Sequence, residues 1–196
     1  YGIKNIIASS SFSVYGKPLY LPIDESHLTA PMNLYGVSKL LSEQLFEYYS
    51  RSENMKITIL RYDGIYGNRQ TIHGFIQYLV ESLSVNDDIE LFHNGTQKRD
   101  HVYVGDVVQA NILAMKYNKK EAFSVFNIGG GDAKTSFETT NTIKDVLKSE
   151  SKIIKSKKTS PMGYDIYLDN NKANKLLGYK PNKLHKNIEI MIKEVK

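Results

Sequence analysis

Apolar residues recur along this chain in short runs and in helical stripes, which together predict alternating strands and helices. Three apolar runs, at 3–8, 57–62 and 123–128, have the length and composition of buried strands. A helical pattern from Tyr35 to about Ser50 lies between the first two. A strand–helix–strand order requires a crossover connection, so the strands are predicted to be parallel.

The second half of the chain shows further helical stripes, interrupted by short extended runs. Helices are predicted from Phe75 to Leu83, around 137–148 and in a segment that ends at Gly178, with a short strand at 152–155. A final amphipathic helix is predicted from the apolar stripe Leu184, Ile188, Met191, Ile192 and Val195.

Short polar signals predict how some of these elements begin and connect. Asn33 is placed to cap the helix that carries Tyr35, and Asp106 is placed to cap another helix that follows it. The pair Asn94-Gly95 stands between two extended runs. It predicts a hairpin that joins 89–92 to 97–104.

Tyr35 and Lys39 lie four residues apart in the first predicted helix, so their side chains would point the same way. The apolar side chains expected on the opposite side, in the core, are those of Val37, Leu41, Leu45 and Tyr48. A lysine ammonium beside a tyrosine favours the phenolate, which can act as a base. The spacing alone is also typical of an ordinary solvated pair, so its interpretation depends on other motifs.

Composition and charge limit the classes of function. Hydrophobic residues make up 41% and charged residues 24% of the chain, as in globular proteins. The absence of cysteine excludes disulfides and thiolate metal sites, and no apolar run reaches the ~20 residues of a membrane span. Residues 148–196 hold 12 Lys against 5 Asp and Glu, but the lysines are spread along amphipathic segments without arginine. We therefore expect a solvated basic face and no membrane, nucleic-acid or metal partner.

Small residues follow two of the predicted strands. Ser9, Ser10 and Ser11 would stand at the carboxyl edge of a parallel sheet, where open α/β folds bind ligands, although an ordinary serine-rich loop is the alternative. The triplet 129–131 consists of glycines, but it has neither the spacing of a dinucleotide loop nor the lysine of a P-loop. We interpret it as a flexible turn.

Six motifs occur along the chain in the order in which one enzyme family has them. They are the segment Ser9–Gly16, the pair Tyr35 and Lys39, the segments Leu60–Gln70 and Gly95–Val107, and the short motifs Phe126–Gly129 and Leu177–Pro181. Together they resemble the extended short-chain dehydrogenase/reductase family, and within it the NAD-dependent sugar-nucleotide epimerases and dehydratases. The resemblance extends over essentially the whole chain.

The resemblance implies an α/β fold, with the C-terminal portion of a Rossmann-type doubly wound parallel sheet and a small mixed α/β lobe. Residues 1–68 and 101–130 would supply the later strands and helices of the NAD-binding domain. Residues 69–100 and 131–196 would form the sugar-nucleotide-binding lobe. The glycine-rich first half of the cofactor domain has no counterpart in these 196 residues.

The resemblance also implies roles for individual residues. Tyr35 would exchange a proton with the sugar 4-hydroxyl during an NAD-dependent epimerisation through a transient 4-keto-sugar. Lys39 would favour the phenolate and bind the nicotinamide ribose, and Ser11 would bind the same sugar oxygen. Arg99 would meet the nucleotide diphosphate. The other expected contacts are Ser9, Ser10 and Tyr62 with the cofactor, and Tyr66 with the substrate.

Further implications concern partners and alternatives. We expect a nucleotide-sugar substrate, a cytoplasmic location and a homodimer through the Tyr35–Ser50 helix. An NADP-dependent keto-sugar reductase, or a non-catalytic fragment that lacks the cofactor half, are the alternatives. Phe12 and Ser13 replace the family's acidic pair, which argues against sugar dehydration. Asp63 and Gly64 stand where the family often has phenylalanine and asparagine, which leaves the sugar open.

Overall fold

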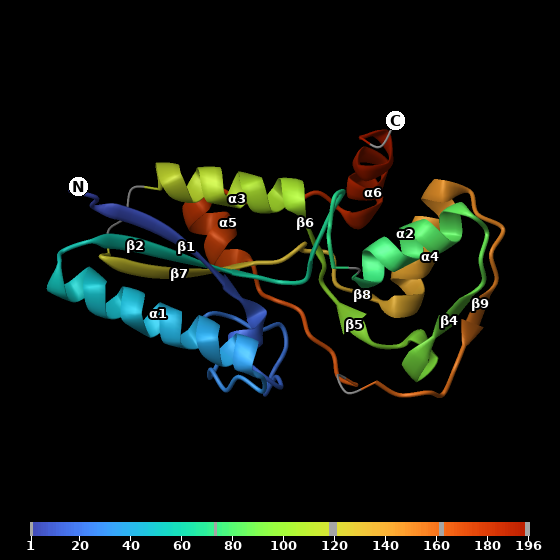
Figure 1. Cartoon of the computed structure of the whole chain (residues 1–196), viewed down its shortest axis with the longest axis horizontal. Coiled ribbons are helices and arrows are strands. Elements are labelled where there is room, and N and C mark those ends of the chain that lie inside the picture. The colour runs from blue at the N-terminus through green and yellow to red at the C-terminus, as the bar shows by residue number, and fades with distance from the viewer. Residues whose placement is uncertain (1, 73, 118–120, 161–162, 195–196) are drawn as a thin grey trace.

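The computed structural model describes residues 2–72, 74–117, 121–160 and 163–194. Figure 1 shows two neighbouring parts, one built on a parallel sheet with helices on both faces and one built from short strands and helices. The α/β architecture with a parallel sheet confirms the predicted fold class. Among the described residues, no helix combines the length and the apolar character needed to span a bilayer.

The parallel sheet contains three strands in the order β1 (Asn5–Ser11), β2 (Lys56–Tyr62) and β7 (Phe123–Ile128). Ser11 pairs with Tyr62, which pairs in turn with Ile128, so the carboxyl ends of the strands are aligned. The three predicted strands and their parallel direction are therefore confirmed. The first strand continues through the three serines, which were predicted to follow it.

Helices cover both faces of this sheet (Figure 1). On one face lies α1 (Leu34–Ser52), and on the other lie α3 (Val104–Lys116) and α5 (Asn171–Leu177). Alternation along β2 directs Arg61 toward α1, whereas Leu60 and Tyr62 enter the core beneath α3 and α5. The left-handed C-cap at Gly178, with a φ of 75°, ends α5 as predicted.

The prediction for the apolar side of α1 is wrong. Exposed fractions are 38% for Val37, 54% for Leu41, 61% for Leu45 and 64% for Tyr48, so these side chains lie outside the core. The sheet is met instead by a stripe at helical spacing, in which Gly36, Glu43 and Ser50 are buried and Leu40 is partly buried. The helix can bury this polar stripe because Glu43 pairs there with Arg61 of β2.

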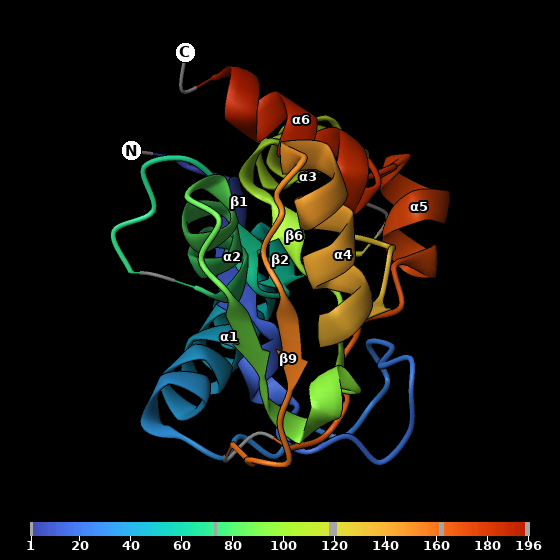
Figure 2. The ribbon, with the colours of Figure 1, turned by 90° about the vertical axis from the view of Figure 1, so that its right-hand side faces the viewer.

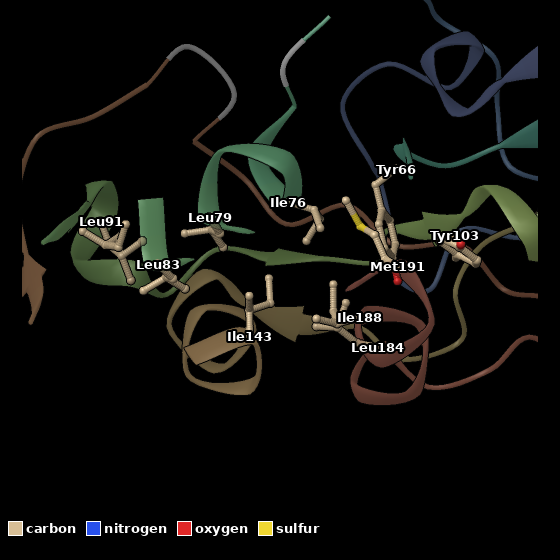
Figure 3. Packing of buried hydrophobic residues seen from close by; sticks show 11 residues of the cluster. Tyr66, Ile76, Leu79, Leu83, Leu91, Tyr103, Ile143, Leu184, Ile188 and Met191 are labelled. Carbon is tan, nitrogen blue, oxygen red and sulfur yellow. The ribbon is translucent and has the colours of Figure 1, made fainter. Parts of the chain in front are cut away.

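The second part of the molecule has its own apolar core. Its helices are α2 (Phe75–Ser84), α4 (Ser136–Leu147) and α6 (Leu184–Lys193). Ile76 and Leu79 of α2 face Ile143 of α4 and Ile188 of α6 (Figure 3). Each side chain of this kind contributes about 1.5–3 kcal/mol on full burial. These helices confirm the predicted periodic segments, and Val195 of the last predicted stripe lies outside the described residues.

Short strands complete this part, which Figure 2 shows from its outer side. The strands β4 (Ile89–Leu91) and β9 (Ile153–Lys155) are parallel, and β5 (Lys98–Arg99) pairs antiparallel with β8 (Lys134–Thr135). The hairpin predicted at Asn94-Gly95 is therefore wrong. The turn exists as η2 (Phe92–Gly95), but the flanking strands pair with distant segments and not with each other.

Contacts around the start of α3 help to join the two parts of the molecule. The strands β3 (Ile65–Tyr66) and β6 (Val102–Tyr103) pair in parallel just before α3 begins. The predicted cap Asp106 is wrong, because Tyr103 is the N-cap and Asp106 lies inside the first turn. Its carboxylate accepts a hydrogen bond from Asn187 of α6 at 2.7 Å, so it ties α3 to the second core.

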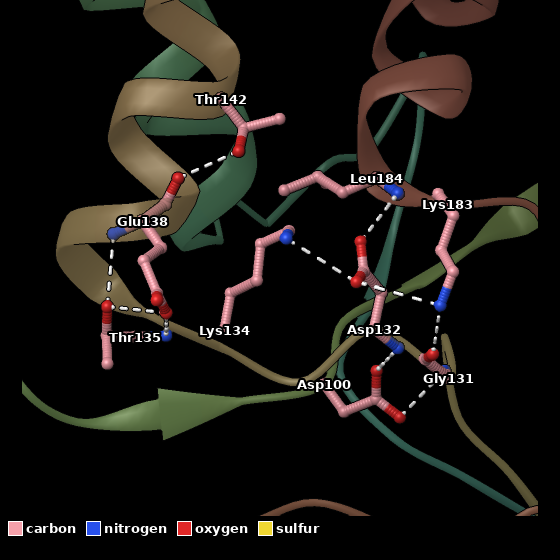
Figure 4. A network of polar contacts seen from close by, with 9 residues as sticks. All are labelled: Asp100, Gly131, Asp132, Lys134, Thr135, Glu138, Thr142, Lys183 and Leu184. Carbon is pink, nitrogen blue, oxygen red and sulfur yellow. Dashed lines mark hydrogen bonds and ion pairs between the residues drawn. The ribbon is translucent and has the colours of Figure 1, made fainter.

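The glycine triplet 129–131 forms a closely packed loop, and Figure 4 shows the contacts of Gly131. Asp100 accepts hydrogen bonds from the backbone N–H groups of Gly131 at 3.0 Å and Asp132 at 2.9 Å. A Cβ atom on Gly130 would lie 2.2 Å from the carbonyl oxygen of His101, so only glycine fits there. The turn after β7 was predicted, but these contacts hold it against the segment that precedes β6.

Candidate active site

Tyr35 and Lys39 stand on the first turns of α1, where the structure brings them together. The side chain of Asn33 accepts a hydrogen bond from the Gly36 N–H at 2.7 Å and caps the helix as predicted. The Lys39 ammonium lies 5.7 Å from the centre of the Tyr35 ring and donates to the Ser9 carbonyl at 3.2 Å. Tyr35 is 55% exposed, so its hydroxyl group can be reached by a ligand.

Ser11 lies in the turn that the start of α1 packs against. A Cβ atom on Gly36 would be 2.5 Å from the carbonyl oxygen of Ser13, so a glycine here lets the helix approach that turn closely. Ser11 caps η1 (Phe12–Val14), accepting a hydrogen bond from the Ser13 N–H at 3.2 Å. Gly36, next to Tyr35, is thus in contact with Ser13, which lies two residues after Ser11.

The other two serines of β1 have different partners. Ser9 is exposed and offers its backbone carbonyl to Lys39. Ser10 is buried, and its hydroxyl donates to the carboxylate of Glu43 on α1. The serine segment is therefore joined to α1 at two neighbouring positions.

The two tyrosines expected near the ligands lie elsewhere. Tyr62 is buried on the opposite face of the sheet, where its hydroxyl accepts a hydrogen bond from Asn111 of α3 at 2.9 Å. Tyr66 is buried in the second core beside Tyr103, at a ring distance of 5.5 Å. The structure does not bring either side chain to the Tyr35 group, and both pack in cores.

Arg99 lines a cavity of about 560 Å³ in the second part of the molecule. Its guanidinium donates to the carbonyl oxygens of Lys98, at 2.9 Å, and Tyr164, and burial lowers its pKa. Aromatic rings contribute other walls, those of Phe75 and Phe92 among them. Flat apolar walls beside an anchored guanidinium suit a base joined to phosphate groups.

Comparison with known proteins shows the family to which the chain belongs. The profile of the "NAD dependent epimerase/dehydratase family" matches residues 1–129. The chain belongs to this family. A Methanocaldococcus jannaschii protein, provisionally named as a UDP-glucose 4-epimerase, is 37% identical over 91% of this chain and 58% of its own length. The dTDP-4-dehydro-6-deoxyglucose reductase of Escherichia coli is 30% identical over 98% of this chain and 61% of its own length.

A solved structure shows the same likeness in three dimensions. The UDP-glucose 4-epimerase of Thermotoga maritima, determined with UDP-glucose, superimposes with a TM-score of 0.87 at 29% identity. The match covers 99% of this chain and 64% of that chain. This chain thus spans about three-fifths of the length of the epimerase/dehydratase relatives named above.

His101 is a buried residue of the cavity that sequence reasoning missed. It lines the same cavity as Arg99, and its pKa is lowered to about 4 by burial and then by the charge of Arg99. A Cβ atom on Gly64 would meet His101 Nδ1 at 3.0 Å. An asparagine at 64, common in the family, would therefore require His101 to move. Gly64 thus leaves the space beside its backbone to His101.

Asp63, next to Gly64, is another residue that differs from the family pattern, and its side chain is ionisable. Its side chain is buried and accepts a hydrogen bond from the Gly64 N–H at 2.6 Å. Burial and then the neighbouring charge of Asp100 raise its pKa well above the ordinary value. Among the described residues, no three potential metal ligands lie together.

Glu43 and Arg61 form a buried ion pair that sequence reasoning also missed. Arg61 donates to the Glu43 carboxylate through Nε at 3.0 Å and Nη2 at 2.6 Å. Two signals were present in the sequence. Glu43 continues the four-residue spacing of Tyr35 and Lys39, and an arginine within a buried strand requires an acidic partner.

Proposed function

We propose that this chain carries the acid/base centre of an NAD-dependent nucleotide-sugar 4-epimerase, with Tyr35 as the acid/base. The observation that carries the proposal is the placement of Lys39, which reaches both the Tyr35 ring and the end of β1. The group stands at the carboxyl ends of parallel strands, the edge at which open α/β sheets bind ligands. Membership of the epimerase/dehydratase family supports the same chemistry.

The residues present fit a bound NAD. An ammonium has three N–H donors, and the bond to Ser9 uses one, so Lys39 can also donate to a ribose hydroxyl. Ser9 is exposed at the same edge. When bound, NAD supplies the hydride acceptor for the sugar carbon. Tyr62 is left out of this proposal because its side chain is buried on the other face.

Each proposed catalytic residue has a defined task. The Tyr35 phenolate would take the proton of the sugar 4-hydroxyl while the hydride at C4 is lost to the bound cofactor, so that a transient 4-keto-sugar results, and Tyr35 would return the proton when hydride comes back to C4. The positive charge of Lys39 favours the phenolate. The Ser11 hydroxyl holds the same sugar oxygen and thereby orients it for proton transfer.

The cavity at Arg99 is the proposed site of the nucleotide diphosphate. The guanidinium would bind phosphate oxygens, and the aromatic walls of Phe75 and Phe92 would hold the base. The names of the relatives favour a uridine nucleotide, and UDP-glucose with UDP-galactose is the proposed substrate pair. In this proposal the sheet part binds the cofactor and the cavity part binds the nucleotide sugar.

A reductase is the second candidate, and the similarity to the E. coli dTDP-4-dehydro-6-deoxyglucose reductase favours it. A reductase would use Ser11, Tyr35 and Lys39 to deliver a proton to a keto-sugar. It would consume NADPH in proportion to product, whereas an epimerase leaves the total amount of NAD unchanged. Spectrophotometry at the nicotinamide absorbance separates the two.

A homodimer through α1 also belongs to the proposal. Val37, Leu41, Leu45 and Tyr48 form an exposed apolar stripe along this helix, and such a stripe fits burial against a second copy. A cytoplasmic location remains a prediction.

Turnover tests the proposed function. The natural protein that carries this chain is incubated with NAD and UDP-galactose, and UDP-glucose is measured. We expect Tyr35→Phe to lower kcat by about 10²–10⁴-fold, the usual contribution of acid/base catalysis. Tyr49→Phe, at an exposed tyrosine of the same helix outside the apolar stripe, is the matched control and should leave turnover unchanged. Equal turnover in both variants would remove Tyr35 from the mechanism.

A further inference from the structure

A chain of buried polar side chains crosses the sheet beneath the proposed catalytic group. It starts at Glu43 of α1, whose carboxylate accepts hydrogen bonds from Ser10 Oγ of β1 and from Arg61 of β2. All three residues are no more than 6% exposed. One carboxylate therefore ties a helix to two strands at once.

The chain continues across the third strand. Arg61 Nη1 donates to the Tyr15 hydroxyl at 2.9 Å, and this hydroxyl donates to Asn127 Oδ1 of β7 at 2.6 Å. Asn127 Nδ2 then donates to the carbonyl oxygen of Ile23 at 2.9 Å. Tyr15 and Asn127 are fully buried. The contacts thus link α1 to every strand of the sheet and to the loop that precedes the helix.

The position of this chain relative to Lys39 gives it a functional meaning. Glu43 follows Lys39 by one helical turn on the same side of α1. Its partner Ser10 stands between Ser9, whose carbonyl holds Lys39, and Ser11. A shift of α1 along β1 would break the hydrogen bond from Ser10 to Glu43 together with that from Lys39 to Ser9. The Glu43 carboxylate therefore fixes the register that sets Lys39 against Ser9.

Charge burial argues that this arrangement serves placement more than stability. Burial lowers the pKa of Arg61, but the hydrogen bonds and the charge of Glu43 outweigh this effect, so the pKa of Arg61 lies above its ordinary value. Removing two charges from water is costly, and well-packed apolar side chains often stabilise a core as well or better. An ion pair of this kind fixes the relative orientation of the two side chains, because a guanidinium and a carboxylate meet in a planar geometry.

We propose that Glu43, held by Arg61, is a positioning residue for the Lys39–Ser11 group in the reaction assigned to Tyr35. The inference rests on the proposed function and adds the network that aligns α1 with β1. Glu43 itself touches neither the sugar nor the cofactor. Its effect is exerted through Ser10 and through the helical turn that carries Lys39.

Four variants of the natural protein test this inference. Glu43→Gln removes the charge, Ser10→Ala removes only the link to β1, and Glu43→Leu with Arg61→Leu replaces the pair by apolar side chains. Glu47→Gln is the matched control, since Glu47 pairs with the exposed Arg51 on the same helix. The measurements are kcat, KM for the nucleotide sugar, the pH–rate profile and the thermal midpoint.

The expected result separates positioning from stability. Glu43→Gln and the double Leu variant should each lower kcat by about 10–100-fold, the range of an acid/base centre partly misplaced, and change KM less than about threefold. The acidic limb of the pH–rate profile should move to higher pH, because the phenolate loses support from Lys39. Ser10→Ala should lower kcat several-fold, and Glu47→Gln should change nothing.

Two outcomes would overturn the inference. The first is a double Leu variant with the kcat and pH profile of the unmodified protein, which would make the pair purely structural. The second, decisive if the Glu43 variants do not fold, is a Ser10→Ala protein with unchanged kcat. The Tyr35→Phe variant in the same assay keeps the two claims apart. If Tyr35→Phe loses turnover while Ser10→Ala has normal kinetics, only the positioning role is contradicted. If Tyr35→Phe has normal turnover, the proposed function itself is contradicted.

Discussion

At the scale of single residues, His101 links the structure to a pH dependence of stability. Its pKa falls from 6.5 to about 4 on folding, so the unfolded chain binds a proton that the folded protein does not. The stabilisation from neutral His101 is therefore present above pH 6.5 and is lost as the pH falls from 6.5 toward 4. Its size is at most about 3 kcal/mol, at about 1.36 kcal/mol per unit of pKa.

The His101→Phe variant isolates this contribution. Chemical unfolding between pH 7 and pH 4 should show a smaller loss of stability in the variant than in the unmodified protein. The comparison is needed because the raised pKa of Asp63 acts in the opposite direction over part of this range. His185→Gln, at a side chain that is 60% exposed, is the control. Parallel pH curves for His101→Phe and the unmodified protein would contradict the buried neutral state.

Arg99 gives a second residue-scale prediction. Arg99→Lys keeps the charge but removes the planar fork that binds two phosphate oxygens. We expect the affinity for UDP to fall about tenfold, which corresponds to about 1.4 kcal/mol. Calorimetric titration of UDP measures it, and Arg51→Lys, at a side chain that is 75% exposed, serves as the matched variant. Unchanged UDP affinity in Arg99→Lys would place the diphosphate elsewhere.

The sequence allowed a contact to be predicted where both partners lie close together in the chain. Tyr35 and Lys39 could be paired because helical geometry alone brings positions four apart to one side. The partners of Glu43 and His101 lie on distant segments, Arg61 of β2 in one case and Gly64 in the other. No local pattern specifies such contacts, although a lone arginine in a buried strand signals that one is needed.

At the scale of elements, the exposed apolar stripe of α1 predicts an association between two copies. The Leu41→Glu and Leu45→Glu double variant should be monomeric where the unmodified natural protein is a dimer. Two buried leucines contribute about 3 kcal/mol or more, so the dimer dissociation constant should rise at least ~100-fold. Light scattering over a range of concentrations measures it. Leu176→Glu, at a leucine of α5 that is 50% exposed, should leave the dimer intact. A monomeric unmodified protein, or a double variant that remains dimeric, would contradict this interface.

Strands and helices with a clear pattern of apolar residues could be predicted, but the pairing of the short strands could not. The run at 57–62 is buried on both faces, as a central parallel strand is expected to be, and it forms β2. The turn at Asn94-Gly95 has the residues of a hairpin, with a φ of 55° at Asn94 and 72° at Gly95. Its strands nevertheless separate, because β4 pairs with β9 and β5 with β8. Distant packing thus overrode a local turn signal.

At the scale of the whole molecule, contacts between distant segments join the sheet part to the cavity part. Val14, Tyr15 and Ile23 from the loop after β1 pack with Ile166 and Leu168 in one buried cluster. The isolated bridges Ile23–Leu168 and Arg99–Ile166 extend the same join. The division into cofactor and sugar-nucleotide domains remains a prediction, and α5 packs on the sheet although it falls within 131–196. The sequence showed no pattern for this joining cluster, because its members come from separate irregular segments.

The central claim is that the Ser11–Tyr35–Lys39 group epimerises a nucleotide sugar at C4, and one labelling measurement tests it most directly. The natural protein is given NAD and UDP-galactose carrying deuterium at C4, and the product is examined by mass spectrometry and NMR. The account predicts UDP-glucose that keeps the deuterium at C4, since that hydrogen leaves and returns within one site, and it predicts that Tyr35→Phe forms this product about 10²–10⁴-fold more slowly. UDP-glucose with solvent hydrogen at C4, or no UDP-glucose from the unmodified protein, would contradict it.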